Sequence, residues 1–155
     1  MNANELRNVA EPVPQGSYQP CVRAGNLVFT AGMTSRVEGV LQHAGHVGVD
    51  VGVDEARAAA RIATRNALVA LRSELGSLDR VRALRLTVYV AAAADFTDHS
   101  IVADAASETL NEVLGPPGAA ARSAVGVSSL PSGASVEVEL TAVREDSCTE
   151  PDSAV

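Results

Sequence analysis

Lysine and tryptophan are absent from this chain of 155 residues, and only four of its residues are aromatic. All twelve basic residues are therefore arginines. Without lysine the chain cannot form a Schiff base through a lysine amine, anchor pyridoxal phosphate or build the lysine-containing phosphate loop of nucleotide-binding proteins. With so few aromatic side chains, the core has to be built from alanine, valine and leucine.

Residues that could hold a metal or a disulfide are also scarce. Cys21 and Cys148 are isolated in the sequence, form no CxxC pair and do not by themselves define a disulfide. His43 and His46 lie in a glycine-rich stretch, where an HxxH pair is more often polar loop filling than a set of metal ligands. We therefore expect no metal site and no organic cofactor.

The charge of the chain is acidic, with 19 acidic and 12 basic residues giving a net charge of −7. This balance disfavours a nucleic-acid surface, which needs clustered cations to neutralise phosphates. No apolar run approaches the roughly 18 residues of a membrane span, and the N-terminus lacks the pattern of a secretory signal. We expect a cytoplasmic protein with neither nucleic acid nor membrane as a partner.

The length predicts one domain, which we place at residues 1–144. Residues 145–155 have almost no apolar content, so a disordered acidic tail is expected there. The first fifteen residues are predicted to be an extended lead-in. Two strands, Cys21–Ala24 and Leu27–Ala31, are expected to follow around a Gly25–Asn26 turn, and then a long loop over 33–52.

Two stretches have the apolar spacing of amphipathic helices. The first runs from Asp54, the expected N-cap, to a stop at Gly76, and its four arginines are expected to form a solvated face. The second is opened by residues 95–97 and ended by the Gly-Pro-Pro-Gly sequence at 115–118.

Alternating apolar residues predict three further strands, over residues 84–90, 123–127 and 136–143. The element order indicates an α+β fold with both helices on one face of a single sheet, and another strand near the N-terminus is left open. In the last strand Glu137, Glu139 and Thr141 point away from the helices. Apolar residues such as Val28 and Val125 must also be placed, so we expect another subunit to cover that face.

Arg122 stands at the start of a strand that looks buried, where a guanidinium is costly unless an anion pairs with it. One interpretation is an ion pair with Glu137 or Glu139. The other is a guanidinium that binds a substrate carboxylate, with a nearby glutamate moving a proton or positioning water. The pattern alone does not separate the two.

Four sequence blocks resemble the RidA (YjgF-like) family over about residues 16–144: GNLVFTAG at 25–32, LRLTVYV at 84–90, ARSAVGVSSLP at 121–131 and VEVELTAV at 136–143. The sequences of these blocks are more similar to a less-characterised bacterial branch of the family than to its founding imine deaminases. The resemblance implies a chorismate-mutase-like fold, a homotrimer and an active site in each cleft between subunits. It also implies hydrolysis of small carboxylated enamines or imines to 2-keto acids and ammonia, without a metal or a cofactor.

The resemblance also assigns roles to individual residues. It makes Arg122 the ligand of the substrate carboxylate, assisted by the backbone amide of Gly32. It makes Glu137 the residue that positions or deprotonates water, with Glu139 as a structural partner unless the register slips by one pair. Tyr18 is the tyrosine that closes the pocket.

Two substrate-binding positions depart from the family pattern. The family's pocket serine is Ala31 here, and the cysteine two residues after the arginine is Ala124. The pocket is therefore expected to be more apolar and wider, suited to a larger imine. Two alternatives stay open: a trimer that binds a small carboxylated metabolite without turnover, and a pathway-specific catalyst that condenses or cyclises an imine, enamine or polyketide-like intermediate. Ribonuclease activity fits the acidic, aromatic-poor chain least well.

Overall fold

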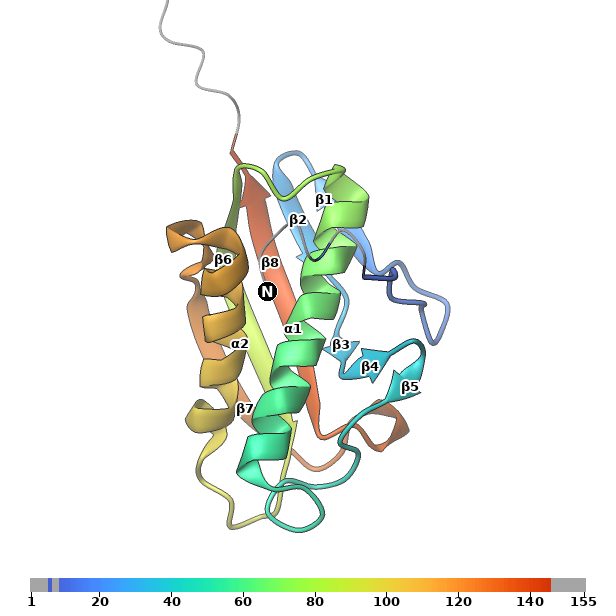
Figure 1. The fold of residues 1–155 in the computed structure, drawn as a ribbon, viewed down its shortest axis with the longest axis vertical. Coiled ribbons are helices and arrows are strands. Elements are labelled where there is room, and N and C mark those ends of the chain that lie inside the picture. The colour runs from blue at the N-terminus through green and yellow to red at the C-terminus, as the bar shows by residue number, and fades with distance from the viewer. Residues whose placement is uncertain (1–5, 7–8, 146–155) are drawn as a thin grey trace, which may run out of the picture.

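The computed structural model describes residue 6 and residues 9–145 (Figure 1). Within them the sheet strands are β1 (Cys21–Ala24), β2 (Leu27–Thr30), β3 (Met33–Thr34), β6 (Val81–Ala91), β7 (Ala121–Val127) and β8 (Val136–Arg144). The hairpin strands are β4 (Arg36–Val37) and β5 (Val40–Leu41), and the helices are α1 (Val53–Leu75) and α2 (His99–Leu114). The tail expected after the domain lies outside these residues, except for Glu145, whose backbone N–H donates to the carbonyl of Arg80.

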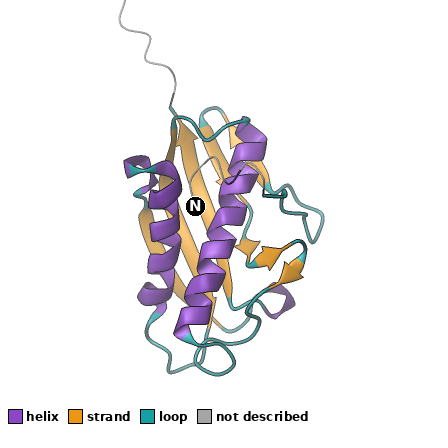
Figure 2. Cartoon of the chain, in the orientation of Figure 1, coloured by secondary structure: helices purple, strands orange, loops and turns teal. Residues whose placement is uncertain are grey.

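The six sheet strands form one mixed sheet, with both helices packed on the same face (Figure 2). The strand order is β1-β2-β8-β6-β7, and β3 pairs with β8. Only β6 and β7 run parallel, since α2 crosses over between them. The predicted α+β architecture is confirmed.

Helix α1 is built on an alanine-rich stripe whose members are almost all fully buried against the sheet. It begins two residues earlier than expected, so the predicted Asp54 cap is wrong. Gly52 is the N-cap, and its backbone N–H donates to the Glu55 carboxylate at 2.9 Å. The helix ends at Gly76, whose φ of 78° is the left-handed conformation that glycine adopts without strain.

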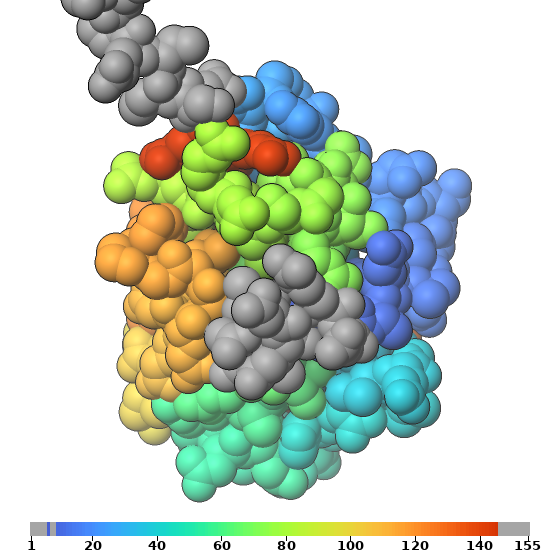
Figure 3. All heavy atoms as spheres, turned by 45° about the horizontal axis from the view of Figure 1, so that its top comes forward, coloured from blue at the N-terminus to red at the C-terminus, as the bar shows by residue number. Residues whose placement is uncertain are grey.

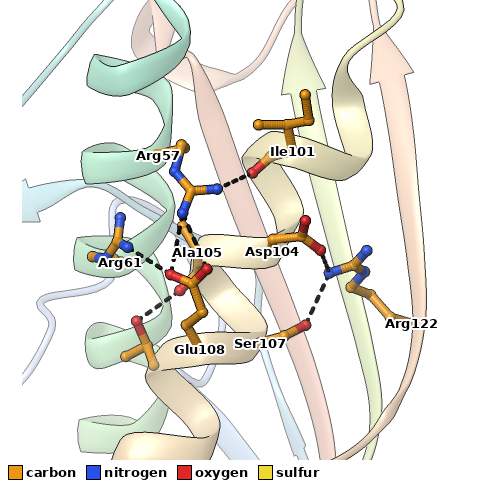
Figure 4. Close-up of polar contacts among 9 residues, drawn as sticks. Arg57, Arg61, Ile101, Asp104, Ala105, Ser107, Glu108 and Arg122 are labelled. Atoms are coloured by element: carbon orange, nitrogen blue, oxygen red, sulfur yellow. Dashed lines mark hydrogen bonds and ion pairs between the residues drawn. The ribbon is translucent and has the colours of Figure 1, made fainter.

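The arginines of α1 do not form the solvated face predicted for them. Glu108 of α2 accepts hydrogen bonds from Arg57 at 3.1 Å and from Arg61 at 2.6 Å, so the two helices are bridged by charge (Figure 4). Arg72 donates to backbone carbonyls of the lead-in segment. The sequence pattern missed these pairs because their partners lie 47 to 66 positions away in the chain.

Strand β6 carries an irregularity that breaks the predicted alternation. Its pairing with β8 shifts register between Ala83 and Arg85, which turns Leu84 outward and leaves it 38% exposed. After the shift, Leu86, Val88 and Val90 are buried as expected. A bulge of this kind adds one residue to one strand of a pair. The side chains before the bulge therefore point to the opposite face from the one that strict alternation predicts.

The sheet face opposite the helices is open in the single chain. Leu27, Phe29 and Val125 are each about 40% exposed there. Val28 belongs to the other face and is fully buried, which corrects its expected placement. Tyr89 donates to the Glu139 carboxylate at 3.0 Å on the open face.

The segment expected as a plain loop over 33–52 contains three short strands. β3 joins the main sheet, and β4 with β5 forms a small hairpin beside it (Figure 1). No strand precedes β1 in the described residues, but the lead-in contributes Leu6, which is completely buried in the core. No helix of the described part is long and apolar enough to cross a membrane.

Candidate functional site

A groove of about 400 Å³ lies where β3 and the following residues meet the start of β8. It brings together four of the predicted site residues: Tyr18, Ala31, Gly32 and Glu137. Pro131 and Ser132, from the turn before β8, line the same groove. Arg122 and Ala124 are not among its lining residues.

Gly32 lets the Glu137 carboxylate lie directly against the backbone. A Cβ atom built on Gly32 would meet Glu137 Oε1 at 2.2 Å, far inside the closest approach that real side chains make. Any other residue at position 32 would therefore displace the carboxylate. The carboxylate can keep this position only because residue 32 has no side chain.

The Glu137 side chain is half-buried, and its surroundings favour the neutral acid. Burial raises the pKa of Glu137 above its usual 4.5, and the negative charge of Glu139 on the same face raises it further. A carboxylate with a raised pKa holds a proton more readily and is a stronger base when ionised. Glu137 therefore has the properties of a proton-transfer group, whereas Glu139 is engaged by Tyr89.

Tyr18 forms one wall of the groove and is 45% exposed. Its hydroxyl accepts a hydrogen bond from the backbone N–H of Gln15 at 3.1 Å. The phenol can still donate its own proton toward the groove or toward water. At Ala31 the groove has a methyl group in place of a hydroxyl.

Arg36 is a site residue that the sequence reasoning missed. It lies on β4, lines the groove with Glu137, and also lines an adjoining hollow of about 150 Å³ beside the lead-in segment. Figure 3 shows the lead-in (blue) next to the β4–β5 hairpin (cyan) at this side of the molecule. The sequence offers one signal that could have pointed to this segment: Asn66, a polar residue inside the apolar stripe of α1.

Asn66 fixes the backbone that carries Arg36. It is 9% exposed, and its side-chain amide donates to the carbonyls of Thr34 at 3.0 Å and Arg36 at 2.9 Å. Both amide hydrogens are therefore used on the segment between β3 and β4. Arg36 itself donates to the carbonyl of Gly39 at 2.8 Å across the hairpin turn.

Arg122 lies elsewhere, on β7 beneath α2. Its guanidinium donates to Asp104 Oδ1 at 2.7 Å and to Ser107 Oγ at 3.0 Å (Figure 4). Of the two interpretations of Arg122, the ion pair with Glu137 or Glu139 is therefore wrong within one chain. Arg122 points toward the helices from the strand next to β6, whereas Glu137 lies on β8 with its side chain on the opposite face.

Ala124 follows Arg122 on the same side of β7, and the next residue on that side, Gly126, is close to His99. A Cβ at Gly126 would meet His99 Nε2 at 2.5 Å. A second cavity of about 570 Å³ opens there, lined by His46, His99 and Phe96 with small apolar residues. His46 Nε2 is 2.8 Å from the carbonyl of Ser128, so that ring nitrogen is held by the backbone.

No group of three or more His, Cys, Asp or Glu side chains in the described residues is arranged to hold a metal ion. The thiol of Cys21 is buried, and burial raises its pKa to about 11, so it is not a nucleophile at neutral pH. The ionisable side chains that line the groove are one carboxyl group, one phenol and one guanidinium, and the hydroxyls of Thr34 and Ser132 and the amide of Gln15 line it with them.

Known proteins with similar sequence and structure agree with this architecture. The model of the YjgF/chorismate-mutase-like family, described as putative endoribonuclease, matches residues 2–142. Protein TCP17 of Trypanosoma cruzi is 36% identical over 132 residues, covering 84% of this chain and 82% of that protein.

Two solved structures are similar over most of their length. The protein Atu1372 of Agrobacterium tumefaciens, of unknown function, is 33% identical with a TM-score of 0.84, covering 92% of each chain. A putative endoribonuclease from Shewanella oneidensis is 29% identical with a TM-score of 0.83, covering 86% of this chain and 89% of its own. The chain belongs to the YjgF/chorismate-mutase-like family.

Proposed function

We propose that the chain hydrolyses a reactive imine or enamine that carries a carboxylate, giving a 2-oxo acid and ammonia. The observation that carries this proposal is the position of Glu137, a half-buried carboxyl group with a raised pKa, held against Gly32 in a groove beside Tyr18. Hydrolysis of a C=N bond needs one group that takes a proton from water and returns it to nitrogen.

The proposed reaction uses Glu137 for both proton transfers. An enamine first tautomerises to the imine, and the ionised Glu137 removes a proton from a water molecule as its oxygen bonds to the imine carbon. The C=N electron pair moves to nitrogen, which takes the proton from Glu137 and becomes the amine of a tetrahedral carbinolamine. Glu137, ionised again, then moves the hydroxyl proton of the carbinolamine to that nitrogen, so the C=O bond forms, the C–N bond breaks and ammonia leaves. Tyr18 hydrogen-bonds to the amine or the water.

The proposal includes a homotrimer, which would add Arg122 of a neighbouring copy to the groove. Within one chain Arg122 and Glu137 are on different strands and opposite faces of the sheet, so they can act together only across a boundary between copies. Two features support such a boundary: the partly exposed apolar residues of the open face, and the outer position of β7 in the strand order.

Ala31 favours a second candidate, binding of a carboxylated metabolite without turnover. In place of a hydroxyl that could contact the polar end of a substrate, the groove has a methyl group there. The same replacement would suit a larger, less polar imine in the hydrolytic proposal. The two functions differ in whether ammonia is released.

Turnover tests the proposal directly. The wild-type chain is mixed with freshly generated 2-aminoacrylate and with bulkier 2-imino acids, and the 2-oxo acid and ammonia are measured. Glu137→Gln is expected to lower the rate by about 10²-fold or more, because it removes the proton-transfer group and keeps the shape. Glu139→Gln is the matched control, since it removes a carboxylate from the same strand face but keeps the proposed proton-transfer group. It takes away only the smaller of the two causes that raise the pKa of Glu137, and leaves burial, the larger one, in place.

Equal rates in wild type and Glu137→Gln would remove Glu137 from the chemistry. Tight binding of a 2-oxo acid with no turnover of any imine would instead favour the second candidate. Cleavage of a single-stranded RNA by the wild type, lost in Glu137→Gln, would replace the proposal by the activity named for the Shewanella protein.

A further inference from the structure

The groove that holds Glu137 also contains a guanidinium group that forms no ion pair with any described residue. Among the described residues Arg36 forms no ion pair, and its one hydrogen bond goes to the backbone carbonyl of Gly39. The other N–H groups of this guanidinium remain available to a ligand. A cation that shares a cavity with a carboxyl group and stays unpaired is unusual, since each would normally neutralise the other.

We infer that Arg36 binds an anionic group of the ligand, so that one chain carries both the anion-binding residue and the carboxyl group of the site. The inference extends the proposed function, because it would place the carboxylate of a 2-oxo or 2-imino acid on Arg36, beside Arg122 of the neighbouring copy in the proposed trimer. The C=O or C=N carbon of the acid would then face Glu137. The anion-binding role itself does not depend on turnover.

Arg36 and Glu137 line the same groove but form no hydrogen bond or ion pair with each other. A guanidinium in contact with Glu137 would lower the pKa of that carboxyl group, but the pKa is raised, by burial and by Glu139. The two side chains nevertheless line the same cavity, whose volume of about 400 Å³ lies in the usual range for small-molecule sites. A small acid can therefore contact both ends.

The backbone of Arg36 is held before any ligand arrives. Asn66 anchors the carbonyl of Arg36 to α1, and the bond from the guanidinium to Gly39 keeps the side chain over its own hairpin. An arginine held in this way loses less conformational freedom on binding than a free surface arginine does. The geometry is that of a built site, in contrast to a solvated charge.

Arg122, the residue expected to bind the carboxylate, is already satisfied within its own chain. It donates to Asp104 and Ser107, and a ligand would have to compete with that carboxylate. Arg36 forms no ion pair among the described residues, although Glu11 and Glu38 line the adjoining hollow with it. A single chain therefore offers an anion a better partner at Arg36 than at Arg122.

Binding of stable oxo acids tests the inference without any turnover. Pyruvate and 2-oxobutanoate are titrated into the full chain by calorimetry, with wild type, Arg36→Gln and Arg36→Lys compared. We expect Arg36→Gln to weaken binding by roughly tenfold or more, and Arg36→Lys to recover part of it, because a lysine keeps the charge but not the planar fork.

Arg23→Gln is the matched control. Arg23 also donates to a carbonyl of its own hairpin turn, that of Gly25 at 2.7 Å, so its substitution removes the same kind of contact elsewhere. Thermal unfolding of each variant checks that the fold is intact.

The outcomes separate the inference from the proposed function. Affinity in Arg36→Gln equal to that in wild type, or no binding of either acid by wild type at millimolar concentration, overturns the inference. Binding that depends on Arg36 in a protein that turns over no imine supports the inference and removes the hydrolytic function. If wild type turns over an imine and Arg36→Gln does so with the same KM, the hydrolytic function is supported and the inference on Arg36 is overturned.

Discussion

Arg36 and Arg122 lie on two sides of the molecule, and their surroundings differ in almost every respect. Arg122 is three-quarters buried and bonded to Asp104 and Ser107, in a block of sequence that closely follows a family pattern. Arg36 lies in the Glu137 groove, on a two-residue strand inside a stretch with no recognisable motif. The family motif pointed to Arg122, but the contacts within the chain leave Arg36, and not Arg122, without a carboxylate partner. The neighbouring side chains therefore decide which arginine can bind a ligand.

Gly32→Ala is expected to have the largest effect, a loss of turnover in the groove that contains Arg36 and Glu137. The added methyl group would occupy the place of the Glu137 carboxylate and push it aside. A displacement of about 1 Å at a reacting group can cost on the order of 10²-fold in rate, so a loss of that size in imine turnover is expected. Initial-rate measurements on the purified variant check it.

Gly16→Ala is the control for that substitution. A Cβ at Gly16 would meet only the Tyr18 ring, at an ordinary contact distance of 3.5 Å. Turnover close to the wild-type rate is expected. A loss as large as that of Gly32→Ala would mean that the lead-in backbone, and not the position of the carboxylate, controls the site.

Asn66→Ala should have the next largest effect, on both stability and binding. It removes two hydrogen bonds from a buried side chain, each worth about 1 kcal/mol, so we expect unfolding free energy to fall by about 2 kcal/mol. Because the Arg36 backbone loses its anchor, binding of 2-oxobutanoate should weaken as well. Urea unfolding and calorimetry measure the two effects.

Thr64→Ala is the control that separates loss of stability from loss of oxo-acid binding. Thr64 is also buried on α1, but its hydroxyl donates to the carbonyl of Ala60 in the same helix. It should destabilise the chain without changing affinity for the oxo acid. Equal affinity in Asn66→Ala and Thr64→Ala would show that Arg36 does not need the anchor.

Glu137 should also make the stability of the chain depend on pH, to a smaller extent. Its pKa is raised in the folded chain, so its stabilising contribution is complete below 4.5 and is lost as the pH rises through the folded pKa. Glu137→Gln should therefore unfold at a higher temperature than wild type at pH 7.5, with the difference disappearing near pH 4. A difference that grows toward low pH would contradict the raised pKa.

Asp104→Asn should have the smallest effect. Asp104 is half exposed and Arg122 is not fully buried, so loss of their ion pair is expected to cost less than about 1 kcal/mol. Affinity of the single chain for oxo acids should not change if Arg36 is the binding residue. Tighter binding in Asp104→Asn would mean that the ion pair with Asp104 had kept Arg122 from binding the acid. Arg122, and not Arg36, would then be the anion-binding residue.

Local patterns predicted most of the fold correctly. Both helices, the β1–β2 hairpin and the long strands followed from apolar spacing and turn residues, because these depend on neighbours a few positions away. The errors have long-range causes. Leu84 turns outward because of a bulge against β8, and the α1 arginines pair with a glutamate on the other helix.

The candidate site was predictable in part. Four of the residues that the family resemblance assigned to the site line one groove, and their roles stay predictions: Tyr18, Ala31, Gly32 and Glu137. The partner of Arg122 was not predictable, because Asp104 faces it only after α2 folds onto the sheet. Arg36 was missed for a similar reason, since its position depends on the anchor that Asn66 provides from α1.

The outer position of β7 has a consequence for how this protein behaves at high concentration. In the described residues β7 pairs only with β6, so one row of its peptide N–H and C=O groups faces outward. Such an edge can add a strand from any other chain, which is how sheets aggregate. Arg122 is the one charged residue of β7, but its guanidinium turns under α2 to Asp104 and Ser107, so it does not shield this edge. The edge of β7 is therefore open to a strand from a second copy of the chain.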